Sequence, residues 1–286
     1  MTATTTTTTD VPGGERAARD PGARFRDLVA AEWLKHRSLR STWIAYGTTA
    51  LAVIGFNAGT AYDTYSHWTL QVSKDRAAFV SDGTALQHAF TANAALLMAL
   101  AIGAIGALVI VGEYSTGTIR TTFAAVPARR SVMAAKAVVV VMVTTVFGMV
   151  VAGVSFALTQ AILDRRDAGV SIGDPGAFRV VLASALLAPV CALTGLALGA
   201  VIRHTASTMI TSAAVILMLP LSLTDDRHWS AVVGHTLPYR AWLRLVDVNY
   251  SPIAFPWSTG GAWTVYAVWA CAACAIAVTS VHRRDQ

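Results

Sequence analysis

The sequence predicts an all-α, polytopic integral membrane protein. Of its 286 residues, 55% are apolar and only 13% are charged, and the mean hydropathy is +0.53. A soluble domain carries about 25% charged residues. About half that share, together with uncharged runs long enough to cross a bilayer, is typical of a chain that passes through a membrane several times.

Residues 1–22 are rich in Thr, Gly and Pro, and we expect them to form a disordered tail. They contain no apolar core followed by a cleavage site, so we expect no secretory signal. The remainder, 23–286, is predicted to form a single transmembrane domain.

The stretch "RFRDLVAAEWLKHRSLRS" follows the tail and predicts a basic amphipathic helix. Its position directly before an apolar run favours a helix in the membrane interface over an ordinary solvated helix. Helical spacing predicts two faces. The apolar face holds Phe25, Leu28, Val29 and Trp33. The polar face largely holds Arg24, Arg26, Glu32, Lys35 and Arg40.

Six runs are apolar enough to be transmembrane helices, for which about 20 residues are needed. They cover 42–62, 88–112, 133–162, 178–201, 206–224 and 261–281. The second and third are longer than a bilayer requires, so we expect them to tilt or to project into water. Pro220 is expected to kink or close the fifth.

The distribution of Lys and Arg predicts that both termini are cytoplasmic. In a six-span topology, 14 of the 22 cations fall on the side of the N-terminus and eight on the other side, and cytoplasmic segments carry the excess. The connector 113–131 is then cytoplasmic, and 63–87, 163–177 and 225–260 are outside. The net charge of +6 fits contact with membrane lipid. No basic domain outside the spans indicates a nucleic-acid partner.

The predicted outer segment 225–260 mixes aromatic, charged and proline residues. It is too polar to span the bilayer and too apolar for a free loop, so we expect a short interfacial helix or a re-entrant turn. Its aromatic residues Trp229, Tyr239, Trp242 and Trp257 are expected to form part of an interfacial aromatic belt.

No catalytic or cofactor-binding pattern is present in the sequence. It lacks the G-x-x-x-x-G-K-[ST] motif of ATP-binding loops and the H-E-x-x-H motif of metalloproteases. Cys271 and Cys274 form a C-x-x-C pair, but the surrounding apolar run favours packing residues over a redox or metal site. The spans hold almost no ionisable groups away from their ends, which argues against a proton relay. We therefore expect no enzyme activity and no cofactor in this chain.

Two glycine patterns predict close helix contacts. Gly195 and Gly199 form G-x-x-x-G in the fourth run, and Gly103 and Gly106 lie about one turn apart in the second. Small residues let helices approach closely in lipid. The sequence leaves open whether this contact lies within one chain or between two copies.

The connector "VGEYSTGTIRTTFAAVPARRSVMAAK" carries more structure than a loop between two spans requires. Gly117 permits a turn that a β-carbon would hinder. Ile119, Phe123 and Val126 have helical spacing, and Pro127 ends the predicted helix. The result is a rigid polar connector suited to holding a soluble partner. The alternative is a well-capped helical hairpin whose basic residues only set the membrane topology.

This connector resembles the signature of bacterial ABC type-2 exporter permeases. In that family a Glu at the end of the second span precedes a Gly-Thr turn, a short helix, a Pro, a basic pair and a Lys. The matching residues are Glu113, Gly117, Thr118, Arg120, Pro127, Arg129, Arg130 and Lys136. The rest of the chain resembles the family in layout.

The resemblance implies a permease subunit in the bacterial plasma membrane, paired with a second copy or a paralogue. The connector is then a cytoplasmic coupling helix that docks a separate ABC ATPase subunit, which binds the ATP. The implied coupling residues are Glu113, Gly117, Thr118, Arg120, Pro127, Arg129 and Arg130. The alternative function is a non-transporting membrane scaffold or sensor that holds a cytoplasmic partner with the same hairpin.

Overall fold

The computed structural model describes residues 24–68, 75–248 and 255–280, and within these ranges the regular structure is helical without a strand. The predicted all-α class is therefore confirmed. The predicted disordered tail, 1–22, lies outside the described residues.

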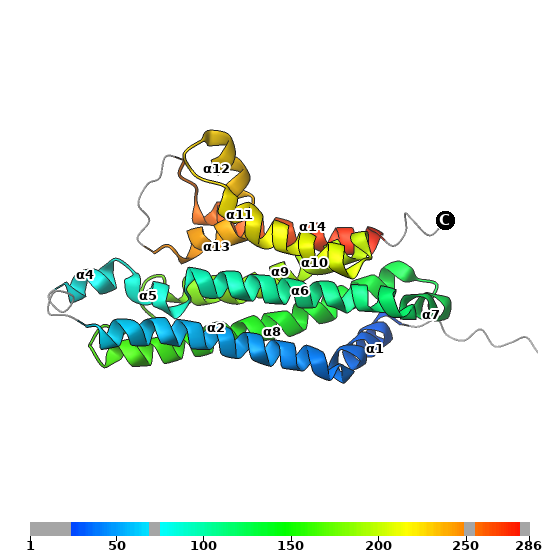
Figure 1. Ribbon diagram of the computed structural model, residues 1–286, viewed down its shortest axis with the longest axis horizontal. Coiled ribbons are helices and arrows are strands. Elements are labelled where there is room, and N and C mark those ends of the chain that lie inside the picture. The colour runs from blue at the N-terminus through cyan, green and yellow to red at the C-terminus, as the bar shows by residue number, and fades with distance from the viewer. Residues whose placement is uncertain (1–23, 69–74, 249–254, 281–286) are drawn as a thin grey trace, which may run out of the picture.

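Six long helical passes run side by side along the longest axis of the molecule (Figure 1). Each coincides with one predicted run. They are α2 (Arg40–Ser66), α6 (Ala92–Thr116), α8 (Arg129–Asp164), α9 (Ala177–Ile202), the fifth pass from Thr205 to Ser222, and α14 (Thr259–Ser280). The second pass begins later than predicted because Thr91 caps it, accepting a hydrogen bond from the Ala94 amide at 3.3 Å.

Five of these passes are long and apolar enough to cross a membrane within the described part of the chain. The remaining pass, α2, has 27 residues, but Tyr, Thr and Asn residues among its apolar ones lower its hydropathy. Asn57 is fully buried: its Nδ2 donates to Ser155 Oγ at 3.1 Å, and its Oδ1 accepts from the Thr91 amide at 3.0 Å. The structure thus shows a polytopic membrane protein, and the count of six spans stays a prediction.

Short helices occupy the two ends of the bundle. The helices α1 (Phe25–Ser38) and α7 (Thr118–Ala125) lie at one end, where α14 also finishes (Figure 1). The opposite end holds α4 (Arg76–Ser81), α5 (Thr84–Ala89), α12 (His228–His235) and α13 (Pro238–Val246). This grouping agrees with the predicted sidedness of the connector and the loops. That α1 and α7 face the cytoplasm remains a prediction.

The core of the bundle is the contact between α6 and α9, where the backbones approach at glycines. A β-carbon on Gly195 would overlap the carbonyl oxygen of Gly103, and one on Gly106 would overlap that of Ala192. The predicted glycine contact is confirmed. It lies within one chain, whereas the sequence left open a contact between two copies. Close approach of this kind replaces the hydrophobic driving force that helices lack in lipid.

The fifth pass changes its winding before Pro220. It consists of α10 (Thr205–Ala213), the π-helical turn η1 (Ala214–Met218) and α11 (Leu219–Ser222). Proline lacks an amide hydrogen and its ring crowds the carbonyl four residues earlier, which here belongs to Ile216 in the π-helical turn. The expected irregularity at Pro220 is therefore present, and α11 ends two residues later.

The segment predicted to lie outside, 225–260, contains the two helices α12 and α13, where a short interfacial helix or a re-entrant turn was expected. The assignment to an aromatic belt is wrong for two of the four residues, Tyr239 and Trp242. Tyr239 and Trp242 are buried in the core, and Trp242 Nε1 donates to Ser184 Oγ at 3.0 Å. The strongly amphipathic α13 turns this aromatic face towards the bundle. Trp229 remains 60% exposed.

Candidate functional site

The connector between α6 and α8 forms the helix α7, as the sequence predicts. Gly117 has a φ of 73°, in the left-handed region, and it is both the C-cap of α6 and the N-cap of α7. A residue with a β-carbon would strain this turn. Thr118 Oγ1 lies 2.9 Å from Thr116 Oγ1 across the turn. At the other end α7 stops at Ala125, two residues before Pro127.

One face of α7 is anchored to the bundle. Ile119 is buried in a cluster with Ile110 of α6 and Leu196 of α9. Phe123 and Val126, which share helical spacing with Ile119, are half-buried and pack against Leu28 of α1. The remaining face of α7 is exposed at the end of the bundle. One face of α7 is therefore fixed to the bundle, and the opposite face is accessible to a partner.

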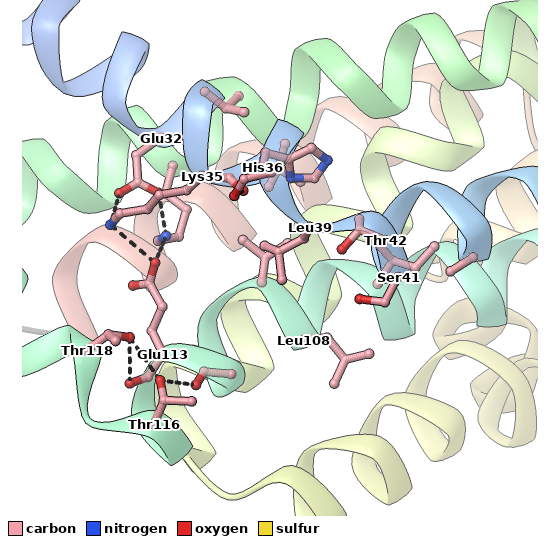
Figure 2. Close-up of a pocket in the computed structure, with 18 residues that line it drawn as sticks. Glu32, Lys35, His36, Leu39, Ser41, Thr42, Leu108, Glu113, Thr116 and Thr118 are labelled. Carbon is pink, nitrogen blue, oxygen red and sulfur yellow. Dashed lines mark hydrogen bonds and ion pairs between the residues drawn. The ribbon is translucent and has the colours of Figure 1, made fainter.

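Four charged side chains meet beside this helix and form what we call the charge cluster: Glu32 and Lys35 of α1, Glu113 of α6 and Lys136 of α8 (Figure 2). Lys136 Nζ lies 2.5 Å from Glu32 Oε2 and 2.7 Å from Glu113 Oε1. Lys35 Nζ lies 2.8 Å from Glu32 Oε1 and 3.4 Å from Glu113 Oε1. Each lysine thus contacts both carboxylates, and three helices are joined.

The charge cluster also reaches α7. Lys35 Nζ is 3.5 Å from Thr122 Oγ1, on the inner side of that helix. The Thr122 hydroxyl in turn donates to the Thr118 carbonyl at 3.0 Å. A displacement of α7 therefore changes the surroundings of a cation that bonds α1 to α6.

The four charges balance; Glu32 and Lys136 are buried, and Glu113 is mostly buried. The exposed fractions are 6% for Glu32, 14% for Glu113 and 2% for Lys136, against 41% for Lys35. Burial alone would raise the pKa of Glu32, but Lys136 and Lys35 hold it below its usual value. Burial alone would lower the pKa of Lys35, but Glu32 and Glu113 raise it. Both groups are therefore charged at neutral pH.

The predicted coupling residues do not form a single group. Glu113 lies in the charge cluster with Lys136, while Gly117 and Thr118 form the turn. Arg120, Pro127 and Arg130 are exposed, and the guanidinium of Arg129 lies 5.4 Å from the centre of the Phe123 ring. Arg120, Arg129 and Arg130 thus mark the outer surface of the connector, whereas Glu113 acts from its interior.

One member of the charge cluster does not lie where the sequence predicted. Glu32 and Lys35 were predicted on the polar face of the interface helix; the side chain of Lys35 is 41% exposed, but Glu32 is only 5% exposed. The buried stripe of α1 is Leu28, Glu32 and His36, while Phe25 and Trp33 are exposed. The four-residue spacing of this stripe was the available signal. It was hidden because burial of Glu32 depends on a partner 104 residues away.

A cavity of about 550 Å³ adjoins the charge cluster. It lies where α1 bends into α2, with α6 and α8 opposite (Figure 2). Its charged end is formed by the charge cluster, and its other walls include Leu108, Val109 and Val140. Among the described residues there is no cluster of His, Cys, Asp or Glu that could hold a metal ion.

The comparison with curated proteins finds no match. The model of the family described as "ABC-2 family transporter protein" matches residues 28–222. This range begins inside α1 and ends with α11, so it contains the charge cluster, the connector and five of the six passes. It covers more than half of the chain. The protein therefore belongs to the ABC-2 transporter family, as a multi-pass membrane permease component.

Proposed function

We propose that this chain is the membrane-spanning subunit of an ATP-driven exporter, and that a separate ABC ATPase docks on α7. The observation that carries the proposal is the position of α7, which is exposed on one face and tied to α1 and α6 on the other. Family membership supports the permease role. The ATP is then bound by the partner subunit, and the second half of the pathway is another copy or a paralogue.

The connector is built to pass on a displacement. It is joined to α6 through Gly117 and to α8 through the short link at Pro127 and Ala128, so a displacement of the connector acts directly on the ends of both helices. The charge cluster adds α1 to this group. An ATPase that pulls or pushes α7 would therefore move α1, α6 and α8 together. Differential binding of ATP to two arrangements of the subunits would supply the bias that a transport cycle needs.

The proposed orientation follows from this role. The end of the bundle that carries α1, α7 and the C-terminus of α14 then faces the cytoplasm of a bacterial cell, where ATP is available. The cation excess on this side supports that orientation. The competing function, a scaffold or sensor that does not transport, would use the same docking face but would not couple ATP hydrolysis to movement of a substrate.

Docking can be tested by substitution on the exposed face of α7. We expect the affinity-tagged chain, purified from its native membrane, to carry a subunit with a nucleotide-binding ATPase fold. Ala124 is exposed, so Ala124→Glu should leave the fold intact and remove that subunit, because it places a charge at the centre of the contact. Ala77→Glu, also at an exposed position but at the opposite end, is the matched control.

Full retention of the ATPase by Ala124→Glu would contradict docking on α7. A complex that hydrolyses ATP but moves no substrate across a vesicle membrane would favour the scaffold instead. Both variants are first compared with the wild type in thermal melting, so that loss of the partner is not confused with loss of the fold.

A further inference from the structure

The cavity beside the charge cluster combines a charged end with apolar walls. Its volume of about 550 Å³ lies within the range of pockets that hold small organic ligands, about 300–1,000 Å³. Leu108 and Val109 of α6 and Val140 of α8 line it at one end. Lys35 and Glu113 line it at the other, while Ser41 and Thr42 lie beyond Leu39, on the side of Leu108. An occupant would therefore need both a polar head and an apolar tail.

Lys35 is the member of the charge cluster that is free to serve such a head. Its side chain is 41% exposed, whereas those of the other three members are 14% exposed or less. Lys136 already bonds both carboxylates at 2.5 and 2.7 Å. Two of the three bonds of Lys35 are long, at 3.4 and 3.5 Å. An ammonium with weak and duplicated bonds can turn to an anion without leaving either carboxylate unpaired.

The surroundings of the cavity indicate that its occupant comes from the bilayer. Arg37 and Arg40 flank the bend between α1 and α2 and are exposed. Leu39, Trp43 and Ile44 at the same bend are 52%, 43% and 68% exposed. Exposed cations beside exposed aromatic and aliphatic residues are typical of the level of lipid head groups. Positive charge at this level concentrates anionic lipid.

We propose that this cavity binds one anionic glycerophospholipid from the adjoining leaflet, with its phosphate at Lys35 and an acyl chain along Leu108, Val109 and Val140. Binding would draw Lys35 away from Glu113 and Thr122. Because these two contacts link α1 to α6 and α7, lipid occupancy would loosen the hold on the connector. This regulatory consequence rests on the proposed function, whereas the lipid site itself does not.

The chain offers a matched pair of substitutions for the test. Gly112 lines the cavity, and a β-carbon there would meet no described atom within 4 Å. Gly112→Leu therefore fills the cavity without a backbone clash. Gly153 on α8 has equally open surroundings among the described residues but does not line the cavity, so Gly153→Leu is the control. Lys35→Met removes the charge while keeping most of the volume, and Lys35→Arg restores it.

The experiment is native mass spectrometry of the purified full chain in detergent, titrated with phosphatidylglycerol or phosphatidylcholine of the same acyl chains. We expect one tightly bound phosphatidylglycerol in the wild type, Gly153→Leu and Lys35→Arg. Affinity should fall about tenfold or more in Lys35→Met, since a bond between charged groups is lost. Gly112→Leu should lose the bound lipid.

Equal binding of phosphatidylcholine by the wild type would overturn the assignment of an anionic head group. Retention of phosphatidylglycerol by Gly112→Leu, or its loss from Gly153→Leu as well, would overturn the assignment to this cavity. The titration contains neither nucleotide nor ATPase. Its outcome is therefore independent of whether α7 docks a partner, and failure of either proposal can be recognised separately.

Discussion

The contact between α6 and α9 differs from the corner of α1, α6, α7 and α8 in what fills the space between helices. At the first, glycines bring the backbones so close that a β-carbon on Gly106 or Gly195 would overlap a backbone carbonyl. At the second, four charged side chains and a cavity of about 550 Å³ lie between the helices. The helix α6 takes part in both, with Gly103 and Gly106 in the first and Gly112 and Glu113 in the second.

This difference indicates which part of the molecule can change shape. Close-packed backbones have a single arrangement, because any shift creates either overlap or a void. Ion pairs and an open cavity have alternatives of similar energy, since one cation can replace another. We therefore regard the α6–α9 contact as a fixed spine and the charged corner as the adjustable part of the bundle.

The largest expected effect is on the spine. Gly195→Leu should destabilise the protein by about 3 kcal/mol, near the upper end for overpacked sites, because the backbone of Gly103 blocks the new side chain. The measurement is thermal melting in detergent. Gly153→Leu, whose β-carbon meets no described atom within 4 Å, should melt close to the wild type. Equal melting temperatures for Gly195→Leu and Gly153→Leu would contradict the account of the α6–α9 contact as a closely packed spine.

The next effect is at the corner. Lys136→Met should cost about 2 kcal/mol, since it removes a buried cation from two carboxylates while Lys35 still contacts both. Adding Glu113→Gln to this variant leaves one carboxylate, Glu32, paired with one cation, Lys35, and should restore most of the melting temperature. If the double variant melts lower than Lys136→Met alone, the cluster is not held by charge balance.

The smallest effect is a pH dependence confined to the corner. Burial and the neighbouring Lys136 lower the pKa of His36 below its usual 6.5, although Glu32 opposes this. The unfolded chain therefore binds the proton more readily, and stability present above pH 6.5 declines as pH falls through the folded pKa. When the pH is lowered from about 7.5 to about 5.5, the melting temperature of the wild type should fall by more than that of His36→Phe. A larger fall in His36→Phe would reverse this sign.

The local features of both regions could be predicted from the sequence. Hydropathy located the six passes within a few residues, because apolar length is a local property. The turn at Gly117 and the end of α7 before Pro127 were predicted for the same reason: each depends on the backbone preferences of one residue. The glycine contact was predicted as well, but its location within one chain required the structure.

Interactions between distant residues could not be predicted in this way. Lys35 and Glu113 are 78 residues apart, and Glu32 and Lys136 are 104 apart. Nothing in local spacing reveals that an acid on an amphipathic helix is buried against such a partner. Trp242 was assigned to the lipid interface for a similar reason, because its hydrogen bond to Ser184 spans 58 residues.

We infer that the ion pairs of the charged corner help to hold α7, in addition to the packing of Ile119 against α6 and α9. Hydrogen–deuterium exchange of the full chain in lipid nanodiscs tests it, with the wild type compared with Glu113→Gln, which keeps the shape of the side chain and removes its charge. We predict faster amide exchange in Thr118–Ala125 and unchanged exchange in α9, because only the corner loses its ion pairs. Unchanged exchange in Thr118–Ala125, or an equal increase in α9, would contradict the claim.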